Sequence, residues 1–180
     1  LYLAQVRGTK YADEIGGVLK ELERMPEELQ ELLDAQENVL NLAAELKDEP
    51  SILFLGRHVG YPVALEGALK LKELAYIHAE GFAAGELKHG PIVVVPPYSR
   101  DQLRDKVISN IAEVRARGAR TIVLAEANDA DARAHADHFI ELPRVSTLLQ
   151  PLPAIVPLQL FACEVATLRG HDVDQPRNLA

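Results

Sequence analysis

The sequence predicts an α/β fold: a three-layer α/β/α domain with a mainly parallel sheet, preceded by a helical arm. Short apolar runs of strand length alternate with longer helical patterns along residues 51–180. Such alternation is typical of a parallel sheet that is covered on both faces and connected by right-handed crossovers. Residues 12–47 instead carry leucines at steps of three and four. We therefore divide the chain into a helical arm at residues 1–50 and a domain at residues 51–180.

The expected elements follow from these patterns in chain order. In the arm, Pro26 is expected to begin a second helix, because proline is tolerated in a first turn. Strands are predicted at three short, largely apolar runs, residues 52–56, 92–95 and 121–125, and a fourth strand at residues 138–142. Helices are predicted at residues 62–77, 99–117 and 148–168. The last two are expected to end at Gly118 and Gly170, since glycine favours the position after a helix.

The composition excludes some classes of protein. The net charge of −8, without a basic stripe, argues against a nucleic-acid partner but not against an anionic small substrate. Cys163 is the only cysteine and lies in an apolar helical run, so we interpret it as a buried structural thiol. No secretory signal opens the chain, and three prolines, at 151, 153 and 157, interrupt the longest candidate membrane span. Because the sequence lacks an initiator methionine, we expect it to be a piece of a longer protein.

Ligands of open parallel sheets bind beyond the carboxyl ends of the strands. This rule places three segments at the expected active edge: Arg57–Tyr61, the loop before Pro91, and the turn Glu126–Asp129.

The segment with the most chemical information is ALEGALKLKE, residues 64–73. Glu66, Lys70 and Glu73 are spaced four and three apart and therefore share one face of the predicted helix. Taken alone, this spacing is better read as a surface ion-pair ladder. The rest of the segment is apolar, however, and a narrow charged stripe on a mostly buried helix favours a functional site.

His89 is a second candidate. Gly90 and Pro91 follow it and prevent a helix from continuing, so its imidazole is expected on a loop. Histidine titrates near neutral pH and is suited to moving a proton to or from a sugar oxygen. An ordinary polar surface histidine is the alternative interpretation.

Several segments together resemble the glucosamine-6-phosphate synthase family, and specifically the C-terminal sugar-isomerase (SIS) lobe of its isomerase domain. They occur in the family's order: Gly56-Arg57, Tyr61-Pro62, residues 64–73, His78–Glu80, residues 83–91 and Asp172–Ala180. Each short motif is weak alone, but the ordered set is specific and spans most of residues 51–180. The resemblance implies a three-layer SIS fold, with residues 1–50 linking it to a preceding SIS lobe.

The resemblance also implies roles for single residues. Glu73 would move a proton between C1 and C2 of the open-chain sugar, with Lys70 beside it and Glu66 paired to Lys70. His89 would open the sugar ring in the neighbouring subunit's site, which implies a homodimer with shared active sites. The tail from Asp172, including Arg177, Asn178 and Ala180, would close over the substrate.

The implied enzyme is a cytoplasmic, isomerising glutamine–fructose-6-phosphate transaminase. Fructose 6-phosphate and glucosamine 6-phosphate would be its ligands, and no metal, cofactor, nucleic acid or membrane is implied. The family's imine-forming lysine would follow Ala180, and its phosphate loop lies in the preceding lobe, so residues 1–180 alone are expected to be inactive. The family also has a short extra segment where Ile92 here runs directly into Val93.

Two other functions remain open at this point. One is a noncatalytic SIS module that senses a sugar phosphate for a regulator, which would have no need of Glu73, Lys70 and His89. The other is a dimerisation scaffold built around the helical arm, which predicts no effect of sugar on stability.

Overall fold

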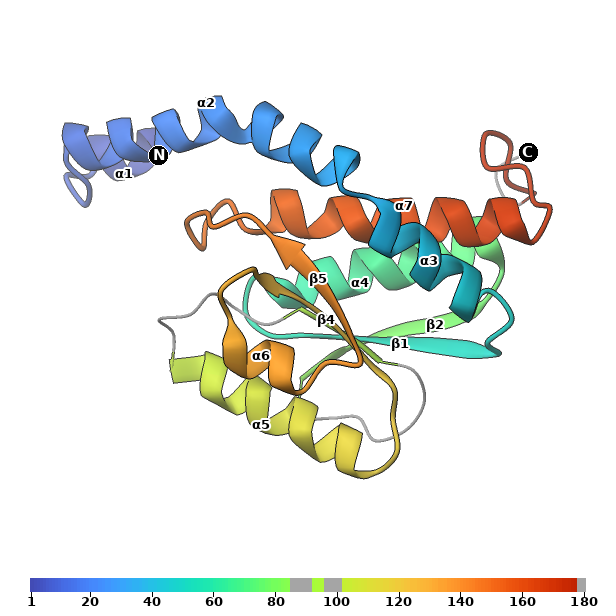
Figure 1. Ribbon diagram of the computed structural model, residues 1–180. Helices are drawn as coiled ribbons and strands as arrows, with labels where there is room; N and C mark the ends of the chain where they lie inside the picture. The colour runs from blue at the N-terminus through green and yellow to red at the C-terminus, as the bar shows by residue number, and fades with distance from the viewer. Residues whose placement is uncertain (85–91, 96–101, 178–180) are drawn as a thin grey trace.

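The computed structural model describes residues 1–84, 92–95 and 102–177, and in them it shows one parallel sheet of five strands. Its order is β2-β1-β3-β4-β5 (Figure 1). These strands are β1 (Ser51–Gly56), β2 (His78–Ala83), β3 (Ile92–Val95), β4 (Thr121–Glu126) and β5 (His138–Leu142). Each neighbouring pair is parallel.

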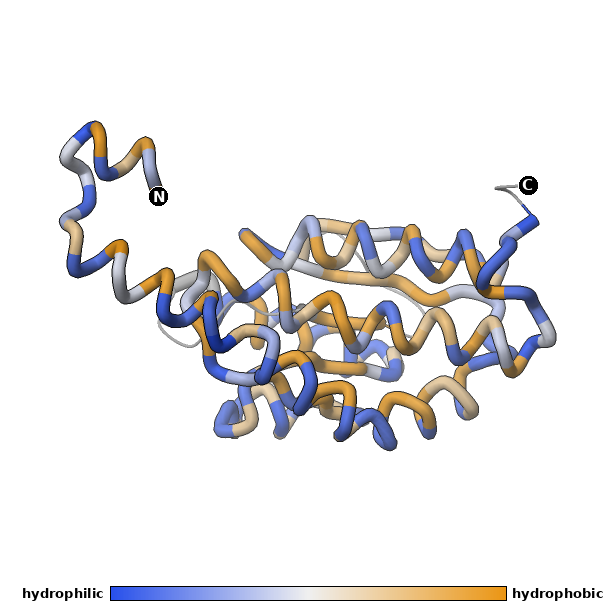
Figure 2. The backbone as a smooth tube through the Cα atoms, turned by 90° about the horizontal axis from the view of Figure 1, so that it is seen from above, coloured by the Kyte–Doolittle hydropathy of each residue, from blue (hydrophilic) through white to orange (hydrophobic). Residues whose placement is uncertain are grey.

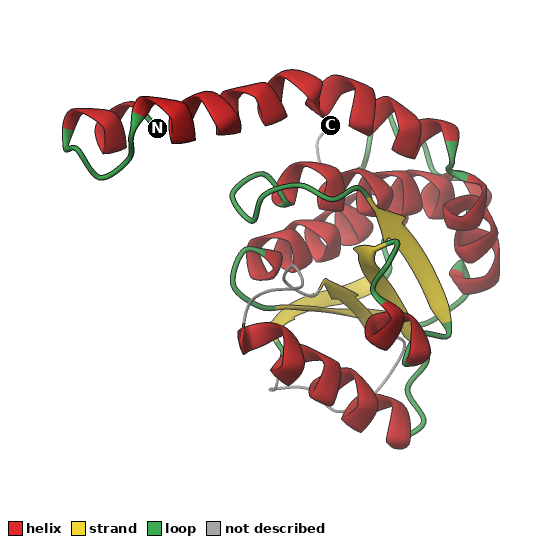
Figure 3. Cartoon of the chain, turned by 60° about the vertical axis from the view of Figure 1, so that its left-hand side comes forward, coloured by secondary structure: helices red, strands yellow, loops and turns green. Residues whose placement is uncertain are grey.

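Helices cover both faces of this sheet (Figures 1 and 3). One face carries α3 (Glu37–Leu46), α4 (Gly60–Lys70) and α7 (Pro151–Leu168). The other carries α5 (Gln102–Ala116) and the short α6 (Ala130–Ala134), which the sequence patterns did not predict. The predicted three-layer α/β/α class is therefore confirmed.

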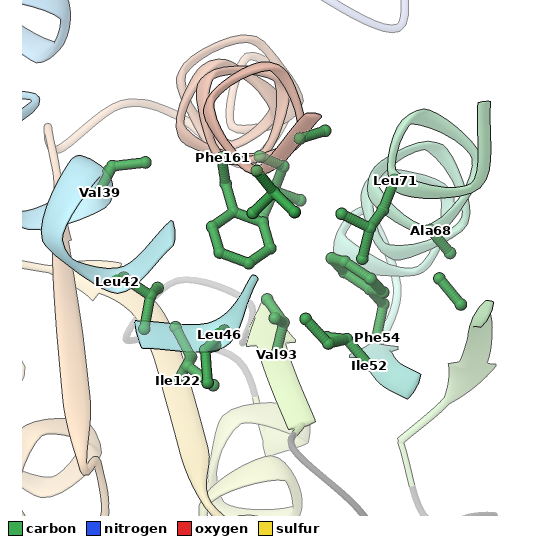
Figure 4. Close-up of a cluster of buried hydrophobic side chains, with 14 of the residues drawn as sticks. Val39, Leu42, Leu46, Ile52, Phe54, Ala68, Leu71, Val93, Ile122 and Phe161 are labelled. Atoms are coloured by element: carbon green, nitrogen blue, oxygen red, sulfur yellow. The ribbon is translucent and has the colours of Figure 1, made fainter. Parts of the chain in front are cut away.

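The strands supply two separate cores, because successive side chains of a strand point to opposite faces. In β1, Ile52 and Phe54 enter the core beneath α4 and α7, where they meet Phe161 (Figure 4). Leu55 enters the core on the α5 side instead. Burial on both faces explains why the inner strands β1, β3 and β4 consist of largely continuous apolar runs.

Of the predicted arm at residues 1–50, α3 packs on the sheet, while α1 (Tyr2–Val6) and α2 (Ala12–Asp34) precede it, and the amino-terminal part projects beyond the sheet (Figure 2). Contrary to the prediction, α2 continues through Pro26 instead of starting anew there. The preceding residue, Met25, is 3% exposed and packs with Leu29 against the loop before α7. We attribute the continuity to this packing, since tertiary contacts routinely override local propensity.

Two further expectations are corrected around α4. The predicted helix at 62–77 is α4 followed by one π-helical turn, Leu71–Ala75. Its next residue, Tyr76, has a left-handed backbone with φ 53°. The segment His78–Ala83, which carries charges and a glycine and has few β-branched residues, forms the edge strand β2.

The prolines of α7 do not interrupt it. Pro151 and Pro153 lie in the first turn, where backbone N–H groups have no intrahelical partner, and the helix continues through Pro157. Among the described residues, α7 alone is long and apolar enough to cross a membrane, by length and composition. It packs against α3, α4 and the π-helix, and 44% of it is buried within the domain. Core helices of globular domains can be equally long and apolar, so length and composition are weak evidence that α7 spans a membrane.

The close packing of α4 yields a stability prediction. A Cβ at Gly67 would lie 2.7 Å from Leu158 Cδ1 and 3.0 Å from Phe54 Cε1, and both neighbours are buried. Gly67→Ala should lower the free energy of unfolding by about 1 kcal/mol, because overpacking exceeds the gain in helix propensity. Urea unfolding measures this change. Gly17→Ala is the matched control, since a Cβ there meets nothing within 4 Å; equal effects of the two variants would contradict the packing argument.

Candidate active site

The structure brings Glu66, Lys70 and Glu73 together, as their spacing predicted. Lys70 Nζ donates a hydrogen bond to Glu73 Oε2 at 2.8 Å, and Glu66 Oε1 lies 3.7 Å from the same nitrogen. The three side chains are about one-third exposed, with 40% for Glu66, 30% for Lys70 and 31% for Glu73. A small molecule can therefore reach all three from solvent.

The chain positions Glu73 through the π-helical turn. Leu71 and Ala75 in this turn are fully buried, which fixes the backbone on either side of Glu73 against the core. Isolated π-helical turns are rare and occur frequently at functional sites. The turn then ends at Tyr76, whose left-handed backbone redirects the chain into β2.

The charges of this group favour an ammonium form of Lys70. The hydrogen bond to Glu73 raises the pKa of Lys70, burial works against this, and the negative charges of Glu73 and Glu66 raise it further. Lys70 therefore stays protonated through neutral pH and holds the Glu73 carboxylate in one position.

The surroundings of the charged stripe differ from the expectation of a mostly buried helix. One flank of α4 is buried, with Ala64 and Ala68 in the core. The other flank exposes three large apolar side chains: Tyr61 at 39%, Leu65 at 42% and Leu69 at 40%. The acid–lysine group thus lies between a packed face and an uncovered apolar one.

The group also lies at an unexpected edge of the sheet. α4 begins just after Gly56, at the carboxyl end of β1, and runs back along the sheet. β2 then begins at His78, which pairs with Ser51 at the amino end of β1. Glu73 is therefore near the amino-terminal edge, whereas Arg57 and Glu126 lie at the carboxyl edge. Among the described residues, Glu73 and the predicted active edge at Arg57 and Glu126 therefore do not form one site; the loop before Pro91, the third segment of that edge, lies outside the described residues.

The carboxyl edge holds a separate charged cluster. Arg104 binds both Asp129 and Asp131, and Asp129 also accepts a hydrogen bond from the Ala132 amide at 2.9 Å as the cap of α6. Burial raises the pKa of Glu126, and the charge of Arg144 opposes this. Because Arg104 and the start of α6 already engage the Asp129 carboxylate, we interpret that ion pair as structural.

The tail reaches Tyr76, close in sequence to Glu73. The Arg177 amide donates to Tyr76 Oη at 2.7 Å, and the Arg177 guanidinium lies 4.6 Å from the ring centroid. His171 meets the same ring edge-on at 4.8 Å. The sequence patterns did not single out Tyr76 or His171. The only available signal was their closeness to the ALEGALKLKE segment and to the tail.

Three predicted site residues, His89, Asn178 and Ala180, lie outside the described residues. In the described ranges, no group of three His, Cys, Asp or Glu side chains is arranged to hold a metal ion.

The family follows from a comparison of sequences. A model of the SIS domain family matches residues 45–169, which include the sheet, α4, the π-helix and α7. The chain belongs to the SIS domain family.

Two curated relatives of this SIS domain are named glutamine–fructose-6-phosphate aminotransferase (isomerizing). The protein of Corynebacterium glutamicum is 58% identical, and that of Corynebacterium diphtheriae is 61% identical. Each alignment covers 100% of this chain but 31% of the relative, so the chain spans about a third of their length. The alignment with the Corynebacterium glutamicum protein spans 191 positions, whereas this chain has 180 residues. That relative therefore has residues in the aligned region that this chain lacks.

A solved structure is similar as well. It is the C-terminal domain of glucosamine-fructose-6-phosphate aminotransferase from Francisella tularensis, which has a TM-score of 0.87 and 35% identity. The similarity covers 97% of this SIS domain chain and 51% of that chain.

The charge coupling in this SIS domain predicts a ranked change in the pKa of Lys70. Glu73→Gln should lower that pKa more than Glu66→Gln, because Glu73 both accepts the hydrogen bond and supplies the larger Coulomb attraction. NMR titration of the Lys70 side-chain nitrogen measures both shifts. Equal shifts, or a larger one for Glu66→Gln, would mean that the 2.8 Å contact does not dominate the Lys70 environment.

Proposed function

We propose that this chain is the C-terminal SIS lobe of the isomerase domain of an isomerising glutamine–fructose-6-phosphate aminotransferase. The whole enzyme would convert fructose 6-phosphate and glutamine to glucosamine 6-phosphate and glutamate. The observation that carries the proposal is the accessible Lys70–Glu73 pair at 2.8 Å, in which Glu73 lies on a π-helical turn anchored by buried Leu71 and Ala75. Identities of 58% and 61% to enzymes of that name support it.

In the proposed reaction, Glu73 is the base that transfers a proton between two sugar carbons. Its carboxylate takes the proton from C1 of the open-chain ketose and returns it to C2, through an enediol or enolamine. Lys70 keeps Glu73 in place by its hydrogen bond, and its positive charge stabilises negative charge that develops on a sugar oxygen. Glu66 lies 3.7 Å from Lys70 Nζ and helps to retain its proton.

We further propose that the enzyme is a cytoplasmic homodimer whose active sites use both chains. In this arrangement His89 of one subunit opens the sugar ring bound beside Glu73 of the other. The exposed apolar flank of α4 supports the proposal, since Tyr61, Leu65 and Leu69 would be covered by a second protein surface next to Glu66 and Lys70. The phosphate group would be held by residues outside this chain.

A noncatalytic sensor and a dimerisation scaffold are less well supported. Neither needs a carboxylate and an ammonium held in contact and open to solvent on a π-helical turn. The SIS fold alone does not distinguish these functions, because one fold hosts many of them.

The proposed base is tested in the complete enzyme with Glu73→Gln. The carboxamide keeps the shape of the side chain but cannot accept the proton, so isomerisation should fall by about a hundred- to ten-thousandfold. Glutamine hydrolysis, assayed separately, should remain largely intact. Glu80→Gln on β2 is the control, because Glu80 is exposed and its ion pair in the described part of the chain is with exposed His78, so both activities should stay unchanged. Isomerisation within a few-fold of wild type in Glu73→Gln would remove Glu73 from this role.

The shared site is tested by mixing two inactive subunits, one with His89→Ala and one with Glu73→Gln. If each site uses both chains, a mixed dimer has one site with both lesions and one with neither, so about half of the wild-type activity per dimer returns. If each site is built from one chain, every site carries a lesion and activity stays at background. Absence of recovery, with subunit exchange shown by mass spectrometry, would assign His89 to its own chain.

A further inference from the structure

Tyr76 has a left-handed backbone conformation, which glycine adopts more easily than a residue with a large side chain. Its φ of 53° and ψ of 30° lie in the left-handed region, which is strained for an L-residue with a side chain and almost unstrained for glycine. A large aromatic residue at this position therefore implies that its side chain contributes something that offsets the strain.

That side chain holds the C-terminal segment at both of its ends. We define this segment as residues 171–177. Near its start, the His171 ring meets the Tyr76 ring edge-on, with centroids 4.8 Å apart and planes at 78°. At its end, the Arg177 amide donates to Tyr76 Oη at 2.7 Å and the guanidinium lies over the ring, 4.6 Å from its centroid.

The segment itself is shaped to make these contacts. The Asp172 carboxylate accepts hydrogen bonds from the Asp174 and Gln175 amides at 2.9 and 3.1 Å, which closes a local turn. Burial and the positive charges of Arg177 and Arg169 lower the pKa of His171, so its ring is neutral at pH 7. A neutral ring packs beside the Arg177 guanidinium without charge repulsion.

Tyr76 also belongs to the backbone that carries the proposed catalytic pair. It follows Glu73 by three residues and ends the same π-helical turn, whose buried residues Leu71 and Ala75 fix it to the core. Glu73 and the ring that holds Arg177 are therefore carried by the same core-packed turn.

We propose that Tyr76 is a positioning residue, which fixes residues 171–177 relative to the Lys70–Glu73 pair and so completes the sugar site. This inference rests on the proposed function. In it, Tyr76 touches neither substrate nor reacting atoms; it acts through the tail. Arg177 is then fixed relative to Glu73.

The experiment uses the complete enzyme with Tyr76→Phe, which keeps the ring and its contacts with His171 and Arg177 but removes the hydroxyl acceptor. Hydrogen exchange of the Arg177 amide should become about three- to tenfold faster, because one hydrogen bond is lost. The kcat for isomerisation should fall several-fold, while glutamine hydrolysis and the melting temperature change little. Tyr76→Leu, which also removes the ring, should lower kcat further. The difference in kcat between Tyr76→Phe and Tyr76→Leu then measures how much the ring alone contributes.

Tyr2→Phe is the matched control, since Tyr2 is 75% exposed on α1 and should leave exchange and kcat unchanged. Unchanged exchange at Arg177 in Tyr76→Phe would overturn the anchoring role. Faster exchange with wild-type kcat would overturn its link to catalysis. If Tyr76→Leu fails to fold, Tyr76→Phe alone decides between these outcomes. Hydrogen exchange is measured without turnover, so it tests the anchoring role of Tyr76 even if the proposed function is wrong. The proposed function is tested separately by the Glu73→Gln assay.

Discussion

The close approach of α4 to the sheet determines where the candidate site lies. A Cβ at Gly67 would collide with Leu158 and Phe54, and one at Gly81 on β2 would lie 2.9 Å from the backbone of Leu65. Helix and strands can be this close only because glycine occupies both contact points. This packing sets the position of the α4 axis and therefore the direction in which Glu66 and Lys70 project from the helix. The π-helical turn, whose Leu71 and Ala75 are buried, positions the backbone of Glu73 in the same way. The backbone of the site is therefore positioned by the core beneath it.

Much of the domain could be predicted from residue patterns because a parallel sheet buries its strands on both faces. The runs that became the inner strands β1, β3 and β4 are almost entirely apolar and need no tertiary information to be recognised. The predicted run at β5, on the other edge, also contains His138 and Glu141. β2 was missed for the opposite reason. It lies at an edge, where His78 and Glu80 point to solvent, so its sequence lacks the signal of a buried strand. Pro26 was misjudged because a local rule cannot register the packing of Met25.

The candidate site was predicted unevenly for similar reasons. Helical spacing alone brings Glu66, Lys70 and Glu73 onto one face, and the structure has them in contact. The general rule about carboxyl strand ends indicated the opposite edge, because it describes where loops gather and not where a crossover helix ends. The contact between Tyr76 and the tail joins residues far apart in sequence, which no local pattern can predict.

The sequence separation between Tyr76 and Arg177 also determines the order in which the contacts of the site form during folding. Lys70 and Glu73 are three residues apart, so their contact forms as soon as the helix does and costs little chain entropy. The contact between Tyr76 and Arg177 closes a loop across a separation of 101 residues, which spans every strand from β2 to β5. During synthesis from the amino terminus, Arg177 emerges after all of these strands. A nascent or partly folded chain therefore carries the charged pair without its anchored tail, and the finished site exists only once the whole domain has folded.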